Sequence, residues 1–534
     1  MTIKDHKYLL ILIAVASFLF FFRVGDMALT DPDETFYAQT AKEMLAADEW
    51  TTPLIFGEPQ FEKPIFYYWL ILISYKLFGV SEFSARLPSV VFGILGILGV
   101  YYLGRLMFSK LCGFISGLIT ATCVEYVMVS RGCVTDMVLT TAVLFCLLFF
   151  LLGWKKERKI YYLFSALWAA VAVLTKGPIG LFIPGIVVIS FVAATRDWRG
   201  LKKIPFLECS AVFLAVALPW YIIVTKIHGD VFLNEFFGFQ NIVRFLKPEH
   251  RIGTSPFFYI PVILGGFFPW SFFLPLGLWA MLKERGDPSE ERGYRIFVLA
   301  WFISVFLFFS VSRTKLVTYI LPMFPAIALI TGRFLERYMT GTGKGNISGR
   351  SMKISFSALT VFSLLGAIGL SLFVRHRYPQ AFFGTAVTSG IFFAGMVAGL
   401  GLSLKEKKQM SIYSTAASVV MICIPLVLYV LPVIEEFESS KEVSLKLKEL
   451  AGANEPIAGE SDGRRGIAFY TDRTDIYDIH YYDDMKAFLS REERVWGIVK
   501  KKHYDQYKEE YGSAISDPVY QFGKKVIFTN KTSF

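Results

Sequence analysis

The stretch DPDETFYAQTAKEML, residues 31–45, follows the apolar run YLLILIAVASFLFFF of residues 8–22 after a short connection. It brings three carboxylates, those of Asp31, Asp33 and Glu34, close to a segment that is apolar enough to enter a membrane. Carboxylates at such a place are costly to desolvate, so the stretch raises the question of what they do.

A helix that begins after Pro32 would carry Asp33 and Glu34 in its first turn. Acidic residues there complement the helix dipole, so the stretch alone allows an ordinary helix start as well as a functional site. The same helix would have an apolar face, which we expect to lie on the membrane surface. That face is formed by Phe36, Ala41, Met44 and Leu45.

The composition is that of a polytopic membrane protein. Of the 534 residues, 54% are hydrophobic, 16% aromatic and only 19% charged, a balance outside the range of soluble globular domains. Lys4 and Lys7 precede the first apolar run, which we expect to be a retained helix and not a cleaved signal peptide. The six cysteines form no CxxC pair, so we expect neither a disulfide framework nor a zinc knuckle.

About thirteen apolar segments are long enough to cross a bilayer, which needs about 20 residues per helix. They lie near residues 8–23, 84–107, 111–129, 135–153, 160–174, 178–194, 206–225, 256–282, 295–312, 317–334, 354–374, 383–403 and 411–432. The segment 65–78 is apolar but brief, and we interpret it as an interfacial helix.

The distribution of basic residues predicts the orientation of these spans. Cytoplasmic loops are rich in Lys and Arg, and with the N-terminus inside nearly every basic loop, such as KKERK at 155–159, falls on the inside. The C-terminal tail then falls outside. We therefore predict a membrane domain and a soluble outer domain, with the limits 1–435 (outer loops 24–83 and 226–255) and 436–534.

The tail has the pattern of a small α/β domain. A helix is expected near residues 438–451. The runs IAFYT at 467–471 and VWGIVKK at 495–501 are typical of strands.

Three further polar positions lie on the predicted outer side. Glu62 and Lys63 are adjacent in FEKPIFYYW, where they form either a surface ion pair or a ligand and a phosphate contact. Asp136 in SRGCVTDM either caps a helix or serves a function at the membrane boundary. Lys176 in LTKGPIG either snorkels to the interface or serves a function. These residues and the carboxylates of 31–34 all lie on the same predicted side of the membrane. If each charged group only reached for the nearest interface, they would not need to share one side.

The order of these motifs resembles that of the bacterial aminoarabinose transferases of lipid A, members of the wider protein mannosyltransferase superfamily. The resemblance covers about residues 8–335. In order, the motifs are DPDETFYA, FEKP, a TD turn, TKGP, NIVRFLKPEHR, PFFYIPVILGGFFPW and SRTKLVTYILPMFPAIAL.

The resemblance implies a mainly α GT-C fold with an outward-facing cavity, followed by the small α/β domain. It also implies a glycosyltransferase that takes a sugar from a polyprenyl-phosphate carrier and uses no nucleotide cofactor. The most specific expectation is transfer of 4-amino-4-deoxy-L-arabinose from undecaprenyl phosphate to lipid A at the periplasmic face of the bacterial inner membrane. The same layout serves other sugars, and other acceptors including proteins.

The acidic motif supplies the expected catalytic groups. By position, Asp33 is the leading catalytic carboxylate, Glu34 lies beside it and Asp136 is a third candidate. A neutral acceptor hydroxyl needs a base, which Asp33 can provide. If the acceptor is itself a phosphate, its oxygen is already anionic, and Asp33 orients it instead.

The departing lipid phosphate needs positive charge or hydrogen-bond donors. Guanidinium and ammonium groups neutralise phosphate oxygens, and a tyrosine can add a hydrogen bond, although a tyrosine at an interface is often a simple anchor. The candidates are Lys63, Lys176, Arg244, Arg251, Arg313, Lys315 and Tyr319.

The resemblance further implies a zinc ion held by the glutamate of FEKP and a histidine of the long outer loop. That glutamate is Glu62, but Asn241 stands where the histidine is expected. His250 is near in sequence and is the candidate second ligand, or else a polar loop residue or phosphate contact.

A lipid or solute transporter is the rival class, because it also combines many spans with buried charges. The polar residues here gather on one face, and the two halves show no repeat. A structural membrane protein would leave the acidic motif unexplained.

Overall fold

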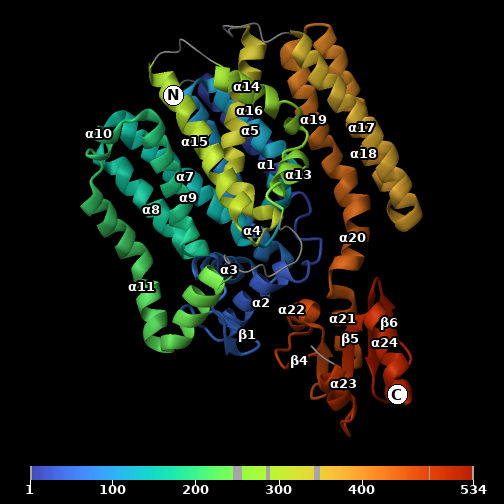
Figure 1. The fold of residues 1–534 in the computed structure, drawn as a ribbon. Helices are drawn as coiled ribbons and strands as arrows, with labels where there is room; N and C mark the ends of the chain where they lie inside the picture. The colour runs from blue at the N-terminus through green and yellow to red at the C-terminus, as the bar shows by residue number, and fades with distance from the viewer. Residues whose placement is uncertain (1–2, 244–254, 284–288, 342–348, 480–481, 532–534) are drawn as a thin grey trace. The chain divides into compact units, whose positions relative to one another are not determined.

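The structure is a computed structural model that describes residues 3–243, 255–283, 289–341, 349–479 and 482–531 (Figure 1). The chain forms two compact units. Unit 1 comprises Met1–Phe22, Phe61–Tyr67 and Ser89–Leu426. Unit 2 comprises Arg23–Gln60, Tyr68–Pro88 and Val427–Phe534. Helices α3 (Phe66–Phe78) and α4 (Glu82–Met107) each contribute residues to both units.

Unit 1 is a bundle of helices. Its described elements are α1 (Ile3–Phe21), α5 (Lys110–Thr122), α6 (Val124–Ser130), α7 (Thr135–Lys156), α8 (Lys159–Lys176), α9 (Ile179–Thr195), α10 (Trp198–Leu201), α11 (Phe206–Phe232), η1 (Leu233–Val243), α13 (Tyr259–Gly266), η2 (Trp270–Phe272), α14 (Leu274–Lys283), α15 (Ser289–Val311), η3 (Val317–Met323), α16 (Phe324–Thr340), α17 (Gly349–Arg377), η4 (Pro379–Ala381), α18 (Phe382–Leu404) and α19 (Lys408–Pro425). Short connections make successive helices pack side by side, as α7, α8 and α9 do in Figure 1.

The polytopic, mainly helical fold predicted from the sequence is confirmed. In the described ranges, eight helices are long and apolar enough to cross a membrane, or up to ten if each of two bent pairs counts as one span. These ten correspond to ten of the thirteen predicted segments. The other three, at 8–23, 160–174 and 178–194, are the helices α1, α8 and α9, and the predicted interfacial segment is α3.

The two bent pairs lie against each other. The α5–α6 pair bends by 68° and the α13–α14 pair by 116°. A break in an apolar helix leaves backbone groups that need partners. Here the backbone N–H of Val124 donates to the carbonyl of Phe268 (3.2 Å), and the indole of Trp270 donates to the hydroxyl of Thr122 (3.0 Å). Each break thus supplies partners to the other.

Unit 2 combines the segment that follows α1, most of α3 with the start of α4, and the C-terminal part of the chain. Besides its share of α3 and α4, its described elements are α2 (Asp33–Ala46), β1 (Leu54–Ile55), β2 (Glu58–Pro59), α20 (Leu431–Glu438), α21 (Lys441–Leu450), β3 (Ile457–Gly459), α22 (Ser461–Thr471), β4 (Ile476–Asp478), α23 (Tyr482–Leu489), β5 (Trp496–Lys500), α24 (Lys501–Tyr511), η6 (Gly512–Ala514), β6 (Tyr520–Phe522) and β7 (Lys525–Thr529). The π-helical turn η5 (Leu426–Val430) lies at its border with unit 1. The domain limits predicted at 435 and 436 stay a prediction.

The small α/β domain predicted in the tail is present as a five-stranded sheet in the order β4-β3-β5-β7-β6. Strands β3, β4 and β5 are parallel, whereas β7 is antiparallel to β5 and β6. Side chains of β7 alternate between two cores, as the two-residue period of a strand requires. Ile527 joins the core beneath α21 and α22, while Val526 and Phe528 join the core beneath α23 and α24.

Two predictions for the tail have different outcomes. The helix near 438–451 is α21, and VWGIVKK contains β5. The strand predicted for IAFYT is wrong, because these residues form the last turns of α22 and are buried. A short apolar run is ambiguous between a buried strand and the buried side of a helix, and here the eleven-residue helix determines its conformation.

Candidate active site

Unit 1 contains a cavity of about 150 Å³. Its walls come from the segment before α3, from α7, η1 and η3, from the residues around the α8–α9 turn, and from the end of α15 and the turn after it. The polar lining residues are Glu62, Lys63, Lys176, Gln240, Ser312, Thr314 and Tyr319. The apolar lining residues are Leu139, Ile179, Phe236, Phe308 and Phe309. Four predicted residues from three separate motifs, Glu62, Lys63, Lys176 and Tyr319, therefore meet at one cavity.

Lys176 at this cavity forms a buried ion pair with Asp136. The ammonium lies 2.7 Å from the Oδ1 atom of Asp136, and the two side chains are 14% and 11% exposed. The ammonium also lies 4.7 Å from the ring centre of Tyr319. Lys176 closes the last turn of α8 and Asp136 lies in the first turn of α7, so each charge complements the dipole of its own helix.

These contacts argue against the helix cap at Asp136 and against simple snorkelling at Lys176, while a functional role of either residue stays a prediction. Val134 is the N-cap of α7, so Asp136 does not cap the helix. Lys176 does not simply reach for the interface, because its ammonium is paired inside the protein. After Lys176 the chain turns at Gly177, whose φ of 78° favours glycine, and enters α9.

Glu62 and Lys63 line the same cavity, just before α3. Both are partly buried, and the Lys63 ammonium donates to the main-chain carbonyl of Glu62 at 3.2 Å. The adjacent acid and base are thus part of the cavity wall and not an isolated surface pair.

The SRTK turn contributes its hydroxyl residues to the cavity. Ser312 and Thr314 line it, whereas Arg313 is exposed and is not among the lining residues. Lys315 is only 5% exposed, and its ammonium donates to the main-chain carbonyl of Ser312. The structure therefore gives Lys315 a role in closing its own turn, beside the cavity lined by Tyr319.

Three predicted residues, Arg244, Arg251 and His250, lie outside the described residues. Among the residues that the structure describes, no three His, Cys, Asp or Glu side chains come together as a metal site. Glu62 alone does not fit a zinc ion, which takes four ligands. The zinc site implied by the resemblance stays a prediction, and no step below depends on it.

The acidic motif lies in unit 2, at the start of α2. Asp33 is exposed in the first turn of the helix. Glu34 is buried, and its carboxylate accepts hydrogen bonds from the backbone and the hydroxyl of Thr30, both at 3.0 Å. Neighbouring carboxylates in the sequence thus occupy opposite environments.

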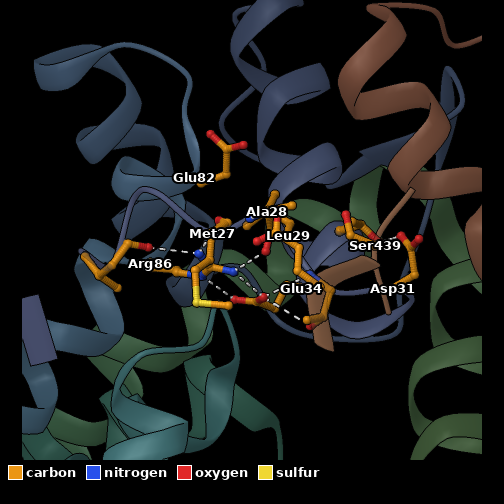
Figure 2. A network of polar contacts seen from close by, with 12 residues as sticks. Met27, Ala28, Leu29, Asp31, Glu34, Glu82, Arg86 and Ser439 are labelled. Carbon is orange, nitrogen blue, oxygen red and sulfur yellow. Dashed lines mark hydrogen bonds and ion pairs between the residues drawn. The ribbon is translucent and has the colours of Figure 1, made fainter. Parts of the chain in front are cut away.

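Glu34 forms a two-point ion pair with Arg86, as Figure 2 shows. The Nε and Nη2 atoms of Arg86 lie 2.8 and 2.7 Å from the two carboxylate oxygens, and the side chains are 5% and 7% exposed. Arg86 also donates to the carbonyls of Val24, Met27 and Ala28 at 2.7–2.9 Å. One guanidinium therefore holds the chain that leads into α2.

Asp31 is buried as well. Its carboxylate lies 2.8 Å from the ammonium of Lys525 and accepts a hydrogen bond from Ser440 at 2.5 Å and one from Thr35 at 3.1 Å. Burial raises the pKa of Asp31, although Lys525 and these hydroxyls act in the opposite direction.

From the sequence we expected the apolar face of α2 to lie on the membrane surface. This expectation is wrong, because the face is buried inside unit 2. Phe36, Ala41 and Met44 are buried, and α2 packs on α22. The guanidinium of Arg465 lies 4.6 Å from the ring centre of Phe36. The hydrophobic face found in the sequence is real, but its partner is a helix of the C-terminal part, which local sequence cannot indicate.

Sequence reasoning missed Arg86 and Lys525. Arg86 follows Glu82 near the start of the apolar helix α4, and a charge there is a signal of function or of a buried pair. Lys525 stands beside a second lysine in an ordinary short strand and gives no such signal.

Comparisons with known proteins agree with this fold. A family model described as dolichyl-phosphate-mannose-protein mannosyltransferase matches residues 62–223. The undecaprenyl phosphate-alpha-4-amino-4-deoxy-L-arabinose arabinosyl transferase of Edwardsiella ictaluri is 26% identical over 495 residues, which are 90% of this chain and 88% of that protein. The Proteus mirabilis transferase 2 of the same name is 32% identical over 336 residues, which are 62% of this chain and 59% of that protein.

A solved structure covers almost the whole chain. The crystal structure of ArnT from Cupriavidus metallidurans bound to undecaprenyl phosphate superposes with a TM-score of 0.83 at 22% identity, covering 99% of this chain and 98% of that one. The chain is therefore a polytopic membrane glycosyltransferase of the GT-C fold, and it resembles the undecaprenyl phosphate-aminoarabinose arabinosyl transferases.

Proposed function

We propose that this protein transfers 4-amino-4-deoxy-L-arabinose from undecaprenyl phosphate to lipid A. The observation that carries the proposal is the cavity of unit 1, where Lys63, Lys176 and Tyr319 lie beside the apolar side chains of the lining. The names of the similar transferases supply the sugar and the carrier. Transfer of another sugar, or transfer to a protein, would use the same cavity.

The reaction needs a leaving group, a nucleophile and no redox change. The bond between the anomeric carbon of the sugar and the phosphate oxygen breaks, and its electrons leave with undecaprenyl phosphate. An acceptor oxygen attacks the anomeric carbon from the opposite face, which inverts the configuration. Stabilising the negative charge on the departing phosphate is the main task of the protein.

The ammonium groups of Lys63 and Lys176 would neutralise that charge. Asp136 holds the Lys176 ammonium in place through their ion pair, so we assign Asp136 a positioning role. The hydroxyl of Tyr319 can donate to a phosphate oxygen. Arg244, Arg251 and Arg313 remain candidate phosphate contacts, and the two former lie outside the described residues.

The apolar part of the cavity suits the carrier. Phe236, Phe308 and Phe309 offer aromatic surface next to the polar groups, and a polyprenyl chain beyond its phosphate is purely apolar.

Asp33 is the proposed catalytic carboxylate. It is exposed at the start of α2, whereas Glu34 and Asp31 are engaged in buried ion pairs. Toward a hydroxyl acceptor Asp33 would accept the proton, and toward a phosphate of lipid A it would orient the acceptor. We assign Glu34 the task of fixing the loop.

We further propose that the reaction takes place on the periplasmic side of the inner membrane, with a cytoplasmic N-terminus and a periplasmic C-terminal domain. The lysine- and arginine-rich loops support this orientation. Fusion reporters on the N-terminus and the C-terminus would test it.

The test of the function is transfer by the purified full-length protein in lipid nanodiscs. Undecaprenyl phosphate-aminoarabinose and lipid A are supplied, and mass spectrometry follows the mass gain of lipid A. Wild type and Asp48→Asn should transfer, while Asp33→Asn should lose most activity with unchanged binding of undecaprenyl phosphate. Asp48 is the matched control, because it is an exposed aspartate beyond the other end of α2. Carrier binding without transfer would reject lipid A as acceptor, and absence of both would reject the donor.

A further inference from the structure

The loop that carries the acidic motif is held by the C-terminal part of the chain through its backbone. Within residues 28–31, three backbone N–H groups donate to acceptors beyond residue 434. The pairs are Ala28 with the Glu435 carboxylate (2.9 Å), Leu29 with the Tyr470 hydroxyl (2.8 Å) and Asp31 with the Glu438 carbonyl (2.9 Å). An N–H group is satisfied only at a defined position, so these bonds fix the path of the loop.

The side chain of Asp31 makes the connection stronger. Lys525, the first residue of β7, donates to Asp31 at 2.8 Å and to the Ser440 hydroxyl at 2.7 Å, and Ser440 donates to Asp31 at 2.5 Å. The Asp31 and Lys525 side chains are 7% and 10% exposed. Three groups from three distant segments thus form a closed triangle of hydrogen bonds inside the protein.

We propose that Lys525 is a positioning residue for glycosyl transfer, which acts through Asp31 to fix the loop that presents Asp33. This inference rests on the proposed function, in which Asp33 is the catalytic carboxylate. Asp31 is separated from Asp33 by Pro32 alone, so a displacement of Asp31 changes where α2 begins. The C-terminal domain then serves catalysis by holding the acidic loop.

The physics of buried pairs gives the proposal a distinctive signature. A buried carboxylate that loses its cation is strongly unfavourable, whereas replacing both partners by neutral groups is often tolerated. Lys525→Met should therefore drive Asp31 out of its position. Asp31→Asn in the same background removes the stranded charge and leaves an amide that can still bond Ser440, so it should restore the loop. A residue needed only for its own bulk would show no such rescue.

The chain offers a matched control for the lysine. Lys500, the last residue of β5, lines the same cavity of unit 2 as Lys525 and pairs with Asp462 at 3.0 Å. Its partner lies in α22 and not in the acidic loop. Lys500→Met makes the same chemical change next to the same cavity and should leave transfer unchanged.

The first experiment compares steady-state transfer by the full-length proteins in nanodiscs. For Lys525→Met we expect kcat to fall by about 10- to 100-fold, the cost of a small misplacement of a catalytic group, with the KM for undecaprenyl phosphate-aminoarabinose nearly unchanged. The double variant Asp31→Asn/Lys525→Met should regain most of the lost kcat. An unaltered kcat in Lys525→Met, or a double variant as impaired as the single one, would overturn the proposal.

The second experiment does not depend on activity and so separates the two proposals. Hydrogen exchange read by mass spectrometry on a peptide that covers residues 27–37 should be faster in Lys525→Met, normal in Lys500→Met, and restored in the double variant. If wild type transfers nothing but this exchange pattern is found, the function is wrong and the loop contact stands. Faster exchange throughout Lys525→Met would mean general destabilisation and would refute a positioning role.

Discussion

The buried pair of Arg86 and Glu34 allows a quantitative prediction. At 2.7 Å and an effective dielectric constant of about 20, their attraction is about 6 kcal/mol before desolvation is subtracted. Because both side chains are at most 7% exposed, solvent screens this attraction little. Removing one partner of such a pair costs about 3–5 kcal/mol, since the other charge is left buried. We expect costs of that size for Glu34→Gln and for Arg86→Gln.

The double variant separates the pair from the rest of the network. The double variant Glu34→Gln/Arg86→Gln leaves no buried charge without a partner. The carbonyls that accept hydrogen bonds from Arg86 lose their donor, however, which should lower the free energy of unfolding by about 1–3 kcal/mol. The summed costs of the two single variants should therefore exceed the cost of the double variant by a coupling energy of at least about 3 kcal/mol. The free energy of unfolding in mixed detergent micelles gives each value.

A second arginine–carboxylate pair in the same unit is the control. Arg473 binds Asp475 at two points, 2.9 and 2.5 Å, but the Asp475 side chain is 67% exposed. A pair so open to solvent should have a coupling energy of at most about 1 kcal/mol. The reasoning fails if the Arg86–Glu34 coupling is no larger than that of this exposed pair.

Three further predictions concern unit 1. Lys176→Met should weaken binding of undecaprenyl phosphate at least about 10-fold in a fluorescence titration, because the proposed contact of its ammonium with the phosphate is lost. The control Lys76→Met, at an exposed site, should leave this affinity unchanged. Equal affinities of the two variants would show that Lys176 does not bind the carrier. Gly177→Ala should lower the free energy of unfolding by about 1–3 kcal/mol, because φ is 78° and ψ is −155° there, and an unchanged melting temperature would contradict this. Gly266→Ala should lower the free energy of unfolding by about 1–3 kcal/mol, because a Cβ at this position would collide with the Glu125 carboxylate. Adding Glu125→Ala should partly restore the melting temperature. If the losses of the two substitutions simply add, the collision is not the cause.

Much of the membrane part could be predicted from hydrophobicity alone. Every predicted span corresponds to a helix or a bent pair, because the lipid demands a continuous apolar segment whatever the helix packs against. The motifs also indicated Glu62, Lys63, Lys176 and Tyr319 as candidate site residues, and these four line one cavity, while their roles stay predictions.

The sequence could not indicate which charged residues form buried ion pairs that stabilise the fold. Asp31, Asp33 and Glu34 look alike in the sequence, yet two of them are buried in ion pairs and one is exposed. Their partners, Arg86 and Lys525, lie 52 and 494 residues away, and no local pattern joins them. The helices of unit 1 could be predicted because the hydrophobicity of each segment determines them. The conformation of the acidic loop could not be predicted, because contacts with distant residues determine it.

The contact between Asp31 and Lys525 has a consequence for how the protein comes into being. Synthesis proceeds from the N-terminus, so the acidic loop is made among the first residues and waits for a lysine that is translated 494 residues later. A chain interrupted between α20 and β7 would hold all of the described helices that are long enough to span and still lack the triangle of Asp31, Ser440 and Lys525. Such a product would insert into the membrane with the Asp31 carboxylate deprived of its cation. Completion of the last strand would thus act as the step that turns an inserted chain into a working enzyme.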